Sequence, residues 1–196
     1  KILDEALMEL RENEFKDMFT QEESNEELQT NRFQGMKFIN DCHIETDMEL
    51  LFPDSYIEST KERVKMYREL DSISCEEDLQ LFEEQLRDRF GKIPEKSYAL
   101  IDVVRLRWMA VKLGVERIIL KNNTMINYFV SKKDSAYYQS PMFGSVLSFV
   151  QQNPRTCVMK ELAGKLTLRF EQVKSVNKAI AILNSVLPQE VSVEEE

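Results

Sequence analysis

Cysteine and histidine often carry nucleophilic or metal chemistry, and this chain holds few of either. Cys42, Cys75 and Cys157 lie far apart in the 196-residue sequence, and His43 is the only histidine. This pattern favours neither a disulfide framework nor a four-ligand zinc site, so we expect reduced, buried thiols. Cys42 and His43 also make a poor nucleophile and base, because adjacent side chains on an extended strand point to opposite faces.

A glycine-lysine pair offers a second possibility for chemistry. The run Gly164-Lys165-Leu166-Thr167 resembles part of a phosphate-binding loop. However, the threonine does not follow the lysine directly, and Met159 stands where the first glycine of such a loop belongs. The sequence therefore predicts no nucleotide site here.

The densest carboxylate group is Glu83, Glu84 and Asp88, which we expect on the solvated face of a helix. No histidine cluster, serine nucleophile motif or metal-ligand spacing accompanies these carboxylates. The sequence therefore predicts no catalytic residue, no metal and no cofactor in this chain, which we expect to be non-enzymatic.

Charge is distributed unevenly along the chain. The formal net charge of -9 argues against a broad electrostatic grip on nucleic acid. Yet residues 1–60 hold 5 basic and 16 acidic side chains, whereas residues 117–187 hold 10 basic and 3 acidic. The basic second half leaves open an alternative function, a nucleic-acid-binding accessory domain. Its candidate residues are Lys132, Lys133, Arg155, Lys160, Lys165, Arg169, Lys174 and Lys178.

Hydrophobic periodicity divides the chain into four parts. Residues 1–19 have the spacing of an amphipathic helix, residues 20–35 form a polar, acidic linker, residues 36–188 form the main domain, and residues 189–196 are an acidic tail. The apolar stripe of residues 1–19 needs a partner and makes a dimer through this segment plausible. With no secretion signal and no apolar run long enough to cross a membrane, we expect a cytoplasmic piece of a longer protein without membrane contact.

The main domain is predicted to place helices first and a small, mostly antiparallel sheet after them, which is an α+β fold. Helix starts are expected at Ser59, at Ser74 with a capping box, and at Pro94. Gly91 and Gly114 are expected to end the second and third helices. The third helix is apolar on more than one face, so it should lie at the centre of the core.

Strand signals surround this helical block. Partial alternation predicts a strand within residues 36–51, and turn signals predict hairpins over residues 115–130 and 156–170. A short helix is expected over residues 142–150 and a last amphipathic helix over residues 175–187.

Five short motifs, in this order and spacing, carry a family resemblance: LFPDSYI (residues 51–57), RVKMYR (63–68), DRFGKIP (88–94), RLR (105–107) and KLGV (112–115). Over about residues 40–187 the chain resembles the C-terminal domain of bacterial transcription-repair coupling factors. Residues 1–19 resemble the last helix after the helicase-like motor of that family.

The resemblance implies a function that composition and periodicity do not indicate. The whole protein would be an ATP-driven DNA translocase that removes stalled RNA polymerase and recruits the excision-repair protein UvrA. This domain would carry neither the motor nor the polymerase-binding element. It would instead pack on the N-terminal UvrA-binding module of the same polypeptide and mask it, as an autoinhibitory domain in nucleotide excision repair.

The resemblance also implies where the masking surface lies. In the family it includes acidic side chains on the helix before the Arg-Phe-Gly motif, which carries over to Asp88, with Glu84 as a neighbour and Arg89 beside it. Gln85 stands where an acid is expected. Helical spacing places Glu84 and Asp88 on one face.

Overall fold

The computed structural model describes residues 37–188. The helix expected over residues 1–19, the linker over 20–35 and the tail over 189–196 lie outside these residues, as does the expected dimer contact. The described part combines helices with a mixed five-stranded sheet, so the predicted α+β fold is confirmed.

Three helices open the domain: α3 (Thr60–Ser72), α4 (Glu76–Phe90) and α5 (Glu95–Lys112). The expected cap at Ser59 forms, because its side chain accepts a hydrogen bond from the backbone N–H of Glu62. The expected cap at Ser74 is wrong. Cys75 is at the N-cap of α4 and makes no side-chain capping bond. Three acidic residues fill the first turn instead, where the helix dipole favours negative charge.

The sheet has the strand order β1-β2-β3-β5-β4. Its strands are β1 (His43–Thr46), β2 (Val115–Lys121), β3 (Thr124–Phe129), β4 (Cys157–Leu162) and β5 (Lys165–Glu171). β1 pairs with β2 in parallel and every other pairing is antiparallel. The strand expected within residues 36–51 is shorter than its pattern suggested, because only four of its residues pair with β2.

Both predicted hairpins are confirmed. Asn122 and Asn123 turn between β2 and β3 with φ of 52° and 57°, and Ala163 and Gly164 turn between β4 and β5 with φ of 51° and 77°. Positive φ at both central residues matches the right-handed twist of the flanking strands. The remaining elements are the short 3-10 helix η1 (Ala136–Gln139), α6 (Pro141–Gln152) and α7 (Val176–Val186).

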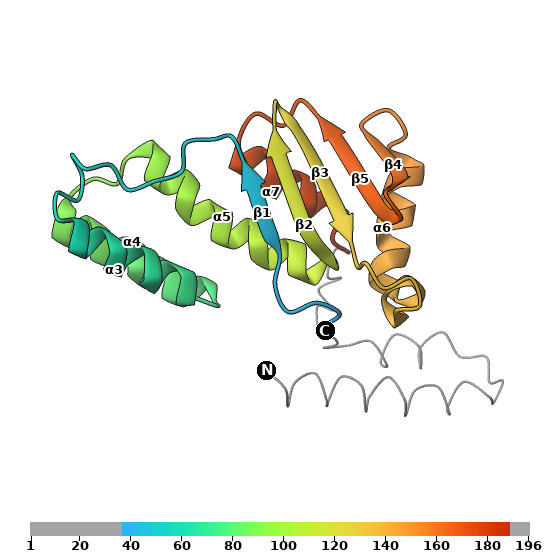
Figure 1. Ribbon diagram of the computed structural model, residues 1–196, viewed down its shortest axis with the longest axis horizontal. Helices are drawn as coiled ribbons and strands as arrows, with labels where there is room; N and C mark the ends of the chain where they lie inside the picture. Colours follow the sequence, from blue (N-terminus) through green and yellow to red (C-terminus); the bar gives the residue numbers. More distant parts are fainter. Residues whose placement is uncertain (1–36, 189–196) are drawn as a thin grey trace, which may run out of the picture.

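Two hydrophobic clusters form the core, and α5 belongs to both. Its first half contributes Ile101 and Val104 to a helical cluster with α3 and α4, whereas its second half contributes Leu106 and Ala110 to a cluster beneath the sheet. In Figure 1, α5 runs from the helix pair to the back of the sheet, where α7 lies beside it. The central position predicted for this helix is therefore confirmed.

Candidate protein-interaction surface

Helix α4 carries the residues expected to face a partner. Leu79, Phe82 and Leu86 point into the helical cluster and are at most 2% exposed. Glu84 and Asp88 lie on the opposite, exposed side, one turn apart. Among residues 37–188, neither carboxylate lies within ion-pair distance of a basic side chain. Two acidic side chains are thus free to contact a partner, on a helix whose opposite face packs in the helical cluster.

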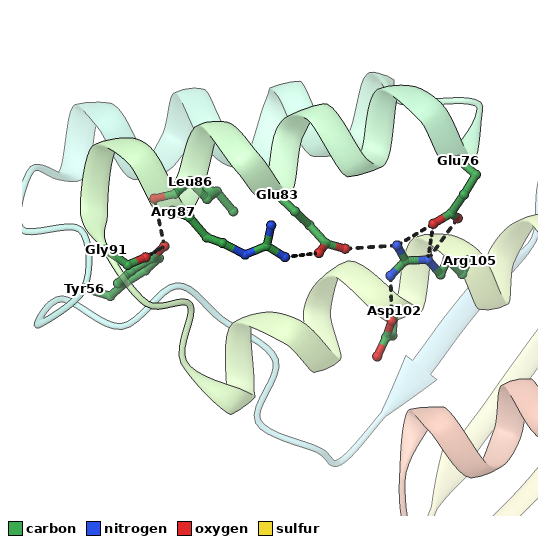
Figure 2. A network of polar contacts seen from close by, with 8 residues as sticks. All are labelled: Tyr56, Glu76, Glu83, Leu86, Arg87, Gly91, Asp102 and Arg105. Atoms are coloured by element: carbon green, nitrogen blue, oxygen red, sulfur yellow. Dashed lines mark hydrogen bonds and ion pairs between the residues drawn. The ribbon is translucent and has the colours of Figure 1, made fainter.

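Glu83 is not on the solvated face, which corrects the expectation for the carboxylate group. It is 9% exposed and accepts hydrogen bonds from Arg87 at 2.8 Å and from Arg105 of α5 at 2.9 Å. Figure 2 shows Glu83 pointing between the two guanidinium groups. Burial of this carboxylate requires such partners, because an unpaired buried charge is costly.

Arg105 is the centre of this network (Figure 2). Its guanidinium donates to both carboxylate oxygens of Glu76, at 2.6 to 3.0 Å, and to Asp102 at 2.8 Å. Together with Glu83, three carboxylates therefore surround one arginine whose side chain is 24% exposed. The planar guanidinium suits this role because its five N–H donors are fixed in direction.

The electrostatics of the network follow from burial and hydrogen bonding. The hydrogen bonds from Arg105 lower the pKa of Glu76. Burial raises the pKa of Asp102, although Arg105 acts in the opposite direction. Hydrogen bonding to Glu76 raises the pKa of Arg105, so this cation stays charged. The network thereby fastens the first half of α4 to α5.

The C-terminal end of α4 is held by other contacts. The single O–H of Tyr56 is shared between the carbonyls of Leu86, at 3.1 Å, and Gly91, at 3.2 Å (Figure 2). Arg89 pairs with Glu62 of α3 at 2.7 Å, and its guanidinium lies 4.9 Å from the centre of the Phe90 ring. Arg89, predicted as part of the interaction surface, is therefore engaged within the domain, and Gln85 beside it is half-buried.

An open groove of about 510 Å³ lies between the helical part and the sheet. No local sequence pattern indicates this groove, because its lining comes from distant parts of the chain. The lining residues are Asp41, Cys42, His43, Ile44, Tyr67, Leu70, Asp71, Leu100, Val103, Val104, Arg107 and Glu116. Arg107 bridges its rim by pairing with Asp71 at 2.8 Å and lying 3.8 Å from Asp41.

The thiols of this groove and of the sheet do not form a nucleophilic site. Burial raises the pKa of the Cys42 thiol to about 12, so the reactive thiolate is scarce at neutral pH. Its sulfur faces the backbone carbonyl of His43 at 3.9 Å, while the imidazole is exposed. Cys157 is buried as expected, but Cys75 is only half-buried.

Between residues 37 and 188 no group of three or more histidine, cysteine or carboxylate side chains is arranged to hold a metal ion. Within the same part of the chain, none of the helices has the length and apolar character that crossing a membrane requires.

Comparison with known proteins identifies the class of this domain. The fold matches the crystal structure of the C-terminal domain of a transcription-repair coupling factor, with a TM-score of 0.60, 17% identity and coverage of 74% of this chain and 92% of the other. Residues 46–140 match the family model of the TRCF domain. The resemblance drawn from the five sequence motifs is thereby confirmed.

The related sequences carry one shared name. The chain is similar to the transcription-repair-coupling factors of Escherichia coli (35% identical over 75 residues, 38% of this chain), Rickettsia prowazekii (24% over 110 residues, 56%) and Buchnera aphidicola (33% over 89 residues, 45%). It spans only 6%, 9% and 10% of the length of these relatives.

Proposed function

We propose that this chain is a non-catalytic, autoinhibitory interaction domain that masks the UvrA-binding module of its own polypeptide in the bacterial cytoplasm. The parent protein would be an ATP-driven DNA translocase that displaces stalled RNA polymerase and delivers UvrA to damaged DNA. In this proposal, residues 1–19 are the terminal helix after the motor, residues 20–35 the linker, residues 36–188 the regulatory domain and residues 189–196 an acidic tail. The observation that supports it is the pair of exposed acids, Glu84 and Asp88, on a helix held rigidly from beneath.

Rigidity supports recognition because the backbone that carries the two acids is already ordered before a partner binds. The Arg105 network fixes the first half of α4, and Tyr56 fixes its end. An ordered surface loses less conformational entropy on binding than a mobile one. Basic side chains of the masked module would pair with these two carboxylates.

The strength of such a contact suits a mask that must open. Exposed ion pairs contribute about 0 to 1 kcal/mol each. Two such pairs, together with the surrounding contact area, would close the domain without preventing its release. Gln85, half-buried where an acid is expected, would add no further charge to the contact.

Calorimetric titration of this chain with the UvrA-binding module of the same polypeptide tests the proposal. We expect saturable binding that Asp88→Arg weakens at least tenfold, because one attractive pair becomes a repulsive one. Asp134→Arg is the matched control, since Asp134 is also exposed but lies in the loop before η1, away from α4. Equal affinities for both variants, with unchanged melting temperatures, would remove Asp88 from the surface.

A further inference from the structure

Helices pack against one face of the sheet and not against the other. Side chains of the face toward α5, α6 and α7 are buried in the core: Ile118, Leu120, Met125, Phe129, Cys157, Leu168 and Phe170. Within the part of the chain that the structure describes, no helix covers the other face, and Figure 1 shows α5 and α7 behind the strands, with α3 and α4 to one side of the sheet. Among residues 37–188, the second face is therefore left uncovered, and we call it the open face.

Strand register determines which side chains share the open face. One row across the sheet contains Arg117, Tyr128, Thr167 and Lys160. Because side chains alternate along each strand, every second residue from this row lies on the same face. Five residues of that face are basic: Arg117, Lys121, Lys160, Lys165 and Arg169. This face gathers half of the ten basic residues in the segment 117–187.

Acidic side chains neutralise only part of this charge. Glu45 accepts hydrogen bonds from Arg117 at 2.9 Å and from Lys121 at 3.2 Å, and Arg169 pairs with Glu171 at 2.7 Å. Lys160 and Lys165 are exposed and have no ion-pair partner among residues 37–188. The open face thus has a surplus of positive charge that suits a polyanion.

Flat and apolar groups lie among these cations. Tyr128 is half-buried near the middle of the sheet, with the Arg117 guanidinium 5.7 Å from its ring centre. Val158 and Leu162 of β4 remain 46% and 51% exposed. An aromatic ring among lysines and arginines is the combination that binds single strands, because bases stack on the ring while phosphates meet the cations.

We infer that the open face of the sheet binds single-stranded nucleic acid, with a base on Tyr128 and backbone phosphates at Lys160, Lys165 and Arg169. A duplex would fit less well, because its bases are stacked inside and cannot lie flat on a sheet. This site lies on β3, β4 and β5, whereas the acids of the proposed masking surface lie on α4. The inference is therefore independent of the masking proposal.

Fluorescence anisotropy with a labelled oligothymidylate of about 15 nucleotides tests the inference on the full chain of 196 amino-acid residues. We expect saturable binding at 50 mM salt that weakens steeply at 200 mM, because each phosphate contact releases a counterion. Lys160→Glu with Lys165→Glu should weaken binding at least tenfold. Lys61→Glu with Lys65→Glu changes the net charge equally on exposed positions of α3, so this control should change the affinity less than twofold.

Tyrosine variants separate stacking from general charge attraction. Tyr128→Leu should weaken binding about tenfold, and Tyr128→Phe should restore it, because phenylalanine keeps the stacking ring. Melting temperatures of all variants establish that they are folded. The inference fails if no binding occurs at 50 mM salt, if both double variants lose affinity equally, or if a duplex of the same length binds more tightly. Unchanged binding by Asp88→Arg would show that the two surfaces are separate.

Discussion

A single arginine determines how the two longest helices of this domain meet. Arg105 donates hydrogen bonds to Glu76, Glu83 and Asp102, so one cation compensates the charge of all three carboxylates. Burial disfavours the charged form of the Asp102 carboxyl. The Glu83 carboxylate is also buried, so it would be strongly destabilised if its arginine partners were removed. Removing Arg105 therefore leaves several partly buried negative charges close together.

We expect Arg105→Met to lower the free energy of unfolding by about 2 kcal/mol or more, because methionine keeps part of the apolar stem but none of the donors. Arg89→Met is the matched control. Its ion pair with Glu62 joins side chains that are 35% and 42% exposed, so the loss should stay below about 1 kcal/mol. Urea denaturation measures both changes, and equal losses would contradict the central role of Arg105.

At the scale of elements, the junction between α5 and β2 leaves no room for a side chain at Gly114. Gly114 has a φ of 72°, and a Cβ atom at this position would lie 2.3 Å from the Tyr137 ring. That ring is fully buried, and its hydroxyl donates to the Leu113 carbonyl at 2.5 Å. Helix and strand can therefore follow each other directly only where the side chain is absent.

Gly114→Ala should destabilise the fold by about 3 kcal/mol or more, because the methyl group overlaps a packed aromatic ring and the backbone conformation disfavours alanine. Gly164→Ala tests the backbone contribution alone. Gly164 has a similar φ of 77° but no atom within 4 Å of its added Cβ, so we expect a loss of about 1 kcal/mol. Thermal denaturation of the two variants gives the comparison, and similar melting temperatures would show that the ring moves aside.

Elements with a strong local pattern were predictable from the sequence, and their pairing was not. The stripe of Leu79, Phe82 and Leu86 predicted a helix with the correct inner face, and the turn asparagines predicted the first hairpin. A local pattern does not identify a partner on another element. The pattern around Glu83 therefore predicts a solvated side chain, whereas in the structure Glu83 is buried and pairs with Arg105, 22 residues away in the sequence. The groove and the open sheet face escaped prediction for the same reason.

At the scale of the whole molecule, α5 joins two cores that would otherwise be separate. Only this helix contributes buried residues to both clusters in the part of the chain that the structure describes, with Ile101 and Val104 on one side and Leu106 and Ala110 on the other. The proposed masking surface and the open face of the sheet both depend on this arrangement, since α4 packs on the helical cluster and the open face belongs to the sheet. We therefore expect the two parts to unfold together, because melting either cluster exposes one half of α5.

Two residues already present report on the two clusters separately. Trp108, the only tryptophan, packs against the helical cluster, and the Cys157 thiol is buried beneath the sheet. Leu86→Ala empties a fully buried position of the helical cluster and should cost about 3 kcal/mol. Labelling of Cys157 is followed by peptide mass mapping, because Cys42 and Cys75 are also free thiols. Under cooperative unfolding, the urea midpoints from Trp108 fluorescence and from Cys157 labelling fall by the same amount. A fall in the Trp108 midpoint alone would show that the helical part opens independently, and the proposed masking surface could then melt while the sheet stays folded.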